Sequence, residues 1–228
     1  MKIVLTLLVL LAAGGGWLAY QKHRPLTQPQ ETMAYALGIQ VGRNLKKQEV
    51  PFDAAAVGRA ISDVLNGNNL KLTEEEMNAA LKAYQEAAQK VAGELAEKRK
   101  LENVAFFKTN ALRKEVTTLP NGLQFEVIKS AKGKKLKLSD VVLANYRGTL
   151  TNGEEFDSSA RGGRPVEFQV NQLIPGLQIG IPQMEEGAVY RFFVPPTLAY
   201  GNQARPGIPA ESILIFEFEA VKVLKAKG

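Results

Sequence analysis

Residues 146–159 read YRGTLTNGEEFDSS: an aromatic residue leads into an Asn-Gly turn, and the chain returns through Phe156 and Asp157. Asn-Gly between two runs that can form strands is a strong signal for a tight β-hairpin. The stretch therefore predicts two antiparallel strands that bring a phenylalanine and a carboxylate to neighbouring positions. A carboxylate beside a ring that could line an apolar pocket needs a functional explanation.

Strand patterns continue on both sides of this hairpin and predict one antiparallel sheet. In the last of them, Phe216 and Phe218 alternate with glutamates, as in a half-buried strand. Only residues 175–181 show a helical pattern in this half of the chain. We therefore expect an α+β unit of about 110 residues. The predicted strands cover residues 123–128, 141–150, 166–170, 188–194 and 213–223.

The N-terminal part predicts two short helices. The first covers residues 32–48 with Thr32 as its cap, and the second runs from Asp53 to an Asn-Gly pair at residues 66–67. Helices of this size cannot bury their own apolar faces. We expect residues 32–70 to pair with the same residues of a second chain.

A long third helix is predicted after them. It starts at a capping box formed by Thr73 and Glu76 and continues without proline to about residue 112. Its apolar residues are sparse, which is typical of a solvated rod rather than of a core helix.

Residues 1–20 differ in kind from the rest, because an apolar run from Ile3 to Tyr20 follows Lys2. The composition is that of a secretory signal, and its small residues allow cleavage after Gly15. Uncut, the run is long enough to span a bilayer as a signal anchor. Both alternatives stay open, and both export the remainder of the chain. We expect membrane contact only through residues 3–20, and only if they are not cleaved.

Composition excludes several classes of function. The chain has no cysteine, and its one histidine is His23, so thiol catalysis, histidine-dependent triads and metal clusters rich in these residues are excluded. We expect no metal and no cofactor. Residues 1–114 carry 16 Lys and Arg against 11 Asp and Glu, and residues 115–228 carry 13 against 12. The positive surplus is too thinly spread for a phosphate-binding stripe, so we expect no nucleic-acid partner.

Four motifs together carry a family resemblance. YRGTLTNGEEFDSS, GRPVEF, IPGLQIGIPQMEEG and VPPTLAYGNQARPGIPAESILIFEFE, in this order within residues 116–224, resemble an FKBP-type peptidyl-prolyl cis-trans isomerase. The N-terminal part resembles the dimerisation arm of the Mip-type periplasmic members. The resemblance implies a half-barrel antiparallel sheet wrapped on one short helix, preceded by an all-α arm. The implied divisions are a signal peptide or anchor at 1–20, a linker at 21–31, a helical dimerisation region at 32–70, a long connecting helix at 73–114 and the isomerase domain at 116–226.

The resemblance also implies the residues of a proline-binding pocket. Many family members have tryptophan at the pocket floor, where this chain has Leu177, and the best-known member has a histidine in the flap, where this chain has Arg205. The implied catalytic residues are Tyr146, Phe156, Asp157, Ile174, Tyr200 and Phe216, and the implied substrate-binding residues are Val166, Leu173, Leu177 and Ile208.

Such a pocket needs no nucleophile, because rotation about an X-Pro bond makes and breaks no bond to carbon. By the family's pattern, the Ile174 N–H and the Tyr200 hydroxyl hold substrate carbonyls, and Asp157 is an organiser that accepts a hydrogen bond from Tyr146 and pairs with Arg161. The implied partners are prolyl-containing unfolded proteins, a second copy of the chain and macrolide-type ligands.

The function implied is that of an exported rotamase acting on folding envelope proteins, with chaperone activity. One alternative is a dimeric periplasmic chaperone with weak isomerase activity. Another is an interaction scaffold in which the long helix carries the function.

Overall fold

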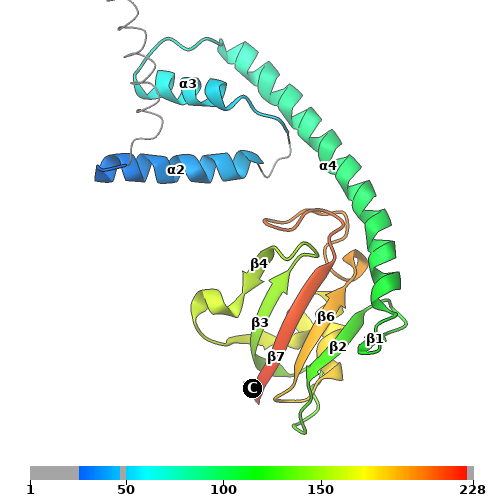
Figure 1. The fold of residues 1–228 in the computed structure, drawn as a ribbon. Coiled ribbons are helices and arrows are strands. Elements are labelled where there is room, and N and C mark those ends of the chain that lie inside the picture. The colour runs from blue at the N-terminus through cyan, green and yellow to red at the C-terminus, as the bar shows by residue number, and fades with distance from the viewer. Residues whose placement is uncertain (1–25, 47–49, 225–228) are drawn as a thin grey trace, which may run out of the picture. The chain divides into compact units, whose positions relative to one another are not determined.

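The structure is a computed structural model that describes residues 26–46 and 50–224. The predicted leader at residues 1–20 lies outside the described residues. Two compact units divide the chain after Ala88, within a long helix (Figure 1). Among the described residues, no helix is both long and apolar enough to cross a membrane.

The first unit consists of α2 (Pro29–Lys46), α3 (Ala54–Leu65) and the start of α4 (Glu74–Asn110). Asp53 caps α3 as predicted, because its carboxylate accepts hydrogen bonds from the Ala55 and Ala56 N–H groups at 2.8 and 3.1 Å. α2 begins at Pro29 and not after Thr32, which corrects the predicted cap. Proline suits the first helical position, since its fixed φ matches the helix and its missing N–H would be unpaired there.

The predicted capping box at the start of α4 is present. The Thr73 N–H donates to Glu76 Oε2 at 2.8 Å, and the Glu76 N–H donates to Thr73 Oγ1 at 3.2 Å. By contrast with these satisfied helix ends, the faces of α2 and α3 are open: neither helix contains a buried residue. The described part of the chain therefore buries neither helix in a core.

The second unit contains the expected antiparallel sheet with one short helix. Its strand order is β1-β2-β6-β7-β3-β4, with β5 paired to β3, and every pairing is antiparallel (Figure 1). The strands are β1 (Val116–Thr118), β2 (Gln124–Lys129), β3 (Val141–Thr149), β4 (Glu155–Ser158), β5 (Val166–Gln169), β6 (Val189–Val194) and β7 (Leu214–Leu224). The helices are α5 (Pro175–Gly180) and the 3₁₀ turns η1 (Ser159–Gly162), η2 (Val170–Gln172), η3 (Ile181–Gln183) and η4 (Pro196–Leu198).

The core of this unit lies between α5 and the sheet, and two glycines allow the helix to approach closely. A Cβ at Gly180 would lie 2.7 Å from Phe192 Cε1, and one at Gly176 would lie 2.4 Å from Val194 Cγ1. Phe192 and Val194 are both fully buried. Gly180 therefore allows the helix to come into close contact with the sheet.

The C-terminal end of α4 is fastened to the sheet through buried polar groups. Gln124 accepts a hydrogen bond from Asn110 Nδ2 at 2.9 Å and donates one to the Phe107 carbonyl at 3.0 Å. Glu126, only 3% exposed, lies between the guanidinium groups of Arg113 and Arg191. The predicted rod is thus solvated along most of its length but not at this end, where these polar contacts and the contact between the Phe106 and Phe193 rings, with centroids 6.0 Å apart, join it to the sheet.

Candidate active site

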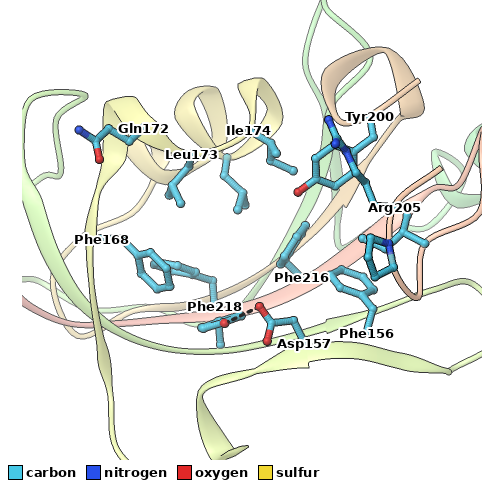
Figure 2. Close-up of a pocket in the computed structure, with 14 residues that line it drawn as sticks. Phe156, Asp157, Phe168, Gln172, Leu173, Ile174, Tyr200, Arg205, Phe216 and Phe218 are labelled. Carbon is cyan, nitrogen blue, oxygen red and sulfur yellow. Dashed lines mark hydrogen bonds between the residues drawn. The ribbon is translucent and has the colours of Figure 1, made fainter. Parts of the chain in front are cut away.

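A cavity of about 520 Å³ opens between α5, the inner face of the sheet and the loop that joins β6 to β7 (Figure 2). The loop, residues 195–213, carries the η4 turn and brings Tyr200 over the cavity. The lining residues are Tyr146, Phe156, Asp157, Phe168, Gln172, Leu173, Ile174, Leu177, Tyr200, Arg205, Pro206, Ile208, Phe216 and Phe218.

The structure brings nine of the ten sequence-predicted site residues to this cavity. The exception is Val166, which lies opposite Ala144 at the start of β5, is 37% exposed and does not line the cavity. Phe168, two residues further along β5, does line it. Side chains two apart in a strand share a face, so the alternation in this strand was the signal that could have identified Phe168. Gln172, Pro206 and Phe218 were also missed.

Rings from four strands, β3, β4, β5 and β7, form the walls. Phe156 meets Phe216 edge to face, with centroids 5.5 Å apart, and Tyr146 meets Phe168 in the same way at 5.2 Å. The sheet register explains why these rings gather, because Tyr146 pairs with Phe218, and Gly148 with Phe216, across β3 and β7. Aromatic pairs in this geometry are favourable beyond the area that they bury, which stabilises a preformed wall.

Asp157 holds the hydroxyl of Tyr146. The Tyr146 hydroxyl donates to Asp157 Oδ2 at 2.7 Å, and the Ser158 N–H donates to Asp157 Oδ1 at 2.9 Å (Figure 2). Arg161 lies 3.9 Å from the same carboxylate and 3.7 Å from that of Glu155. The expected hydrogen bond from Tyr146 is therefore present, and Arg161 is shared between two carboxylates at the cavity's edge.

Two polar groups of the cavity have no protein partner among the described residues. They are the backbone N–H of Ile174, which precedes the first turn of α5, and the hydroxyl of Tyr200, which points into the cavity in Figure 2. Both remain able to donate a hydrogen bond to a bound molecule. The ring of Tyr200 is covered by the Arg205 guanidinium at 5.4 Å, a cation–π contact that holds both side chains at the cavity mouth.

Burial, together with the hydrogen bond to Asp157 and the negative charge of that carboxylate, raises the pKa of Tyr146 to about 12. The pKa in the fold lies above the ordinary value of 10.0. The folded state therefore binds this proton more tightly than the unfolded chain does. The resulting stabilisation is complete below about pH 10 and is lost as the pH rises through about 12.

We expect a flat activity profile between about pH 6 and 9, because Tyr146 stays protonated throughout that range. His23, the one histidine of the chain, lies outside the described residues. An ultraviolet titration should show a late tyrosine ionisation that the Tyr146→Phe variant lacks. A fall in activity centred below pH 9 that this variant abolishes would contradict the assignment.

The chemistry available to this site is that of binding and orientation. No group of three or more histidine, aspartate or glutamate side chains gathers as metal ligands within the described residues. The cavity offers aromatic walls for an apolar group, and its two donors without a partner among the described residues can receive hydrogen-bond acceptors.

Comparisons with known proteins give one consistent family. A family model described as the domain amino-terminal to FKBP-type peptidyl-prolyl isomerase matches residues 30–127, and the FKBP-type peptidyl-prolyl cis-trans isomerase model matches residues 132–221. The chain is 34% identical over 207 residues to the peptidyl-prolyl cis-trans isomerase Mip of Coxiella burnetii, covering 88% of this chain and 90% of that protein. It is 34% identical over 206 residues to the outer membrane protein MIP of Legionella longbeachae, with 88% of each covered. The crystal structure of FkpA from Escherichia coli superposes with a TM-score of 0.63 at 31% identity, covering 89% of this chain and all of that one.

Proposed function

This chain belongs to the FKBP-type peptidyl-prolyl cis-trans isomerases, and from that premise we propose that the cavity beside α5 is its isomerase site and that it acts on unfolded or folding proteins after export. One observation carries the site assignment: an aromatic cavity that offers two hydrogen-bond donors without a partner among residues 26–46 and 50–224, the Ile174 N–H and the Tyr200 hydroxyl. An X-Pro segment presents the matching features, a small apolar ring flanked by carbonyl oxygens.

The task of such a site is energetic rather than chemical. Uncatalysed rotation about an X-Pro bond takes about 10–100 s at 25 °C, with a barrier of ~20 kcal/mol. Bringing it to milliseconds requires a factor of roughly 10⁴–10⁵, which corresponds to about 5.5–7 kcal/mol of preferential binding to the twisted amide. The twisted amide has lost much of its charge separation, so it loses less than the planar amide does when it leaves water for an apolar cavity.

Each lining group then has a role in that preference. The Ile174 N–H and the Tyr200 hydroxyl each hold a substrate carbonyl, which orients the prolyl segment in the cavity while the bond before the proline turns. Asp157 holds Tyr146 in place through its 2.7 Å hydrogen bond. Leu177, only 5% exposed, forms the floor beneath the proline ring.

The helical unit supports the further proposal of a homodimer through residues 32–70. Large apolar side chains on α2 and α3 are exposed in the single chain, among them Leu37 at 58% and Val64 at 63%. Exposed apolar faces of this extent are typical of association surfaces, and a second copy of the same helices would cover them. Two cavities in one dimer could hold two segments of the same unfolded client, which is the basis for chaperone activity.

The test uses a chain of residues 26–228 and asks three questions of it. We expect sedimentation at the mass of a dimer, catalysed isomerisation of a short prolyl peptide, and suppressed aggregation of a refolding protein. Tyr200→Phe should lower kcat/KM about fivefold to tenfold, because one neutral hydrogen bond contributes roughly 1 kcal/mol. Suppressed aggregation without turnover would favour the alternative, a chaperone with weak isomerase activity. If the chain shows neither isomerase activity nor suppression of aggregation, the proposal is refuted.

A further inference from the structure

The end of α4 contacts the loop that covers the cavity, far from it in sequence. Arg99 Nη1 donates to the Ala210 carbonyl at 3.0 Å, and Asn103 Nδ2 donates to the Glu211 carbonyl at 2.8 Å. The two donors are four residues apart in the helix and so lie on one face, while their two acceptors are consecutive. Two adjacent carbonyls of the loop are thus held by one turn of the helix.

These carbonyls belong to the base of the loop segment 201–211, whose other end lines the cavity. The Glu211 N–H donates to the Gly201 carbonyl at 2.7 Å and closes the base. Beyond it, Arg205 and Ile208 exchange two backbone hydrogen bonds at 2.8 and 2.9 Å. Arg205, Pro206 and Ile208 all line the cavity. A displacement of the base would therefore move the cavity wall.

The backbone at the base is strained. Glu211 has a φ of 58°, the one positive φ outside glycine among the described residues. A residue with a side chain is unfavourable in this region, and such a conformation persists only where its surroundings hold it. The contacts that hold Glu211 are its own hydrogen bond to Gly201 and the one that its carbonyl accepts from Asn103.

We propose that Arg99 and Asn103 are positioning residues of the isomerase site: they fix the 201–211 segment from outside, so that the end of α4 forms part of the site without touching the substrate. This inference rests on the proposed function of the cavity.

The experiment compares the double variant Arg99→Ala/Asn103→Asp with the unaltered chain of residues 26–228. Asp has the shape of Asn but no N–H to donate. We expect kcat/KM for a prolyl peptide to fall about tenfold, because the variant loses the two hydrogen bonds that hold the 201–211 segment. Amide hydrogen exchange at Glu211 and Ile208 should quicken about tenfold, while exchange at Phe216 and Phe218 in β7 stays unchanged. The matched control is Lys98→Ala/Glu102→Ala, which removes an exposed ion pair from the same turn of the helix and should change neither quantity.

The two readouts separate this inference from the proposed function. Faster exchange in the loop with an unchanged kcat/KM would overturn the positioning role, and so would unchanged exchange. Faster exchange throughout β7 would show a merely structural role and would also overturn it. If the unaltered chain has no isomerase activity at all, the proposed function fails, whereas the exchange measurement still tests whether α4 holds the loop.

Discussion

Gly148→Ala should lower kcat/KM for a prolyl peptide by about tenfold to a hundredfold. A Cβ at this position would lie 2.6 Å from Cε2 and Cζ of Phe156 and 3.2 Å from Cε1 of Phe216. Both rings are walls of the cavity, so the new methyl group displaces the surface that would hold the proline ring. Overpacking of this kind costs typically 1–3 kcal/mol, and each 1.36 kcal/mol lost from binding of the twisted amide is a factor of ten in rate.

The fall in kcat/KM of Gly148→Ala should be larger than the fraction of unfolded protein accounts for. Phe156 is half-buried and can turn outward while the strands remain paired. The measurements are the peptide isomerisation rate and the thermal midpoint of the same sample. Gly162→Ala serves as the matched control, since a Cβ there meets nothing within 4 Å and its φ is not positive. Equal rates in the Gly148 variant and the unaltered chain would mean that the Phe156–Phe216 wall does not bind the substrate.

Asp157→Ala should lower kcat/KM about tenfold or more with only a small loss of stability, because the carboxylate is half exposed to solvent. The carboxylate accepts the 2.7 Å hydrogen bond from Tyr146, and a hydrogen bond to a charged group contributes about 1.5–3 kcal/mol. Without it the Tyr146 ring loses the contact that orients its hydroxyl. The side chain of Asp157 is 52% exposed, so its removal leaves no buried cavity.

Asp157→Asn separates two roles of this carboxylate, because the amide keeps an acceptor oxygen and removes the charge. Full activity in the Asn variant would identify Asp157 as an organiser of Tyr146. Activity as low as that of the Ala variant would show that negative potential near the rotating bond contributes. Unchanged kinetics in the Ala variant would remove Asp157 from the site altogether.

The sheet could be predicted because its signals are local. Asn152-Gly153 predicted the hairpin between β3 and β4, and Gly153 has a φ of 84° at the end of a turn in which its N–H donates to the Leu150 carbonyl at 2.9 Å. Alternation of Phe216 and Phe218 predicted a strand with one buried face, and both rings line the cavity. The resemblance then supplied the members of the pocket, since no local pattern says which distant strands meet.

The attachment of α4 could not be predicted in the same way. Arg99 and Asn103 look like solvated residues of a polar rod, and their acceptors are backbone carbonyls 111 and 108 residues away. Glu126 and Gln124 are buried although their residue types are mostly exposed. Polar contacts leave no periodic pattern in a sequence, so the attachment of α4 to the sheet could not be read from it. The domain start at residue 116 remains a prediction. The compact unit of the structure begins earlier, at Gln89.

The most direct test of the central claim, that this cavity holds a proline ring and eases rotation about the bond before it, is magnetisation-exchange NMR on a prolyl peptide mixed with the chain of residues 26–228. We expect cis-trans exchange to quicken from about 10–100 s to milliseconds, with proline ring protons close to those of Phe216 and Leu177. Exchange at the uncatalysed rate, or rapid exchange with the proline in contact with residues outside the cavity, would contradict the claim.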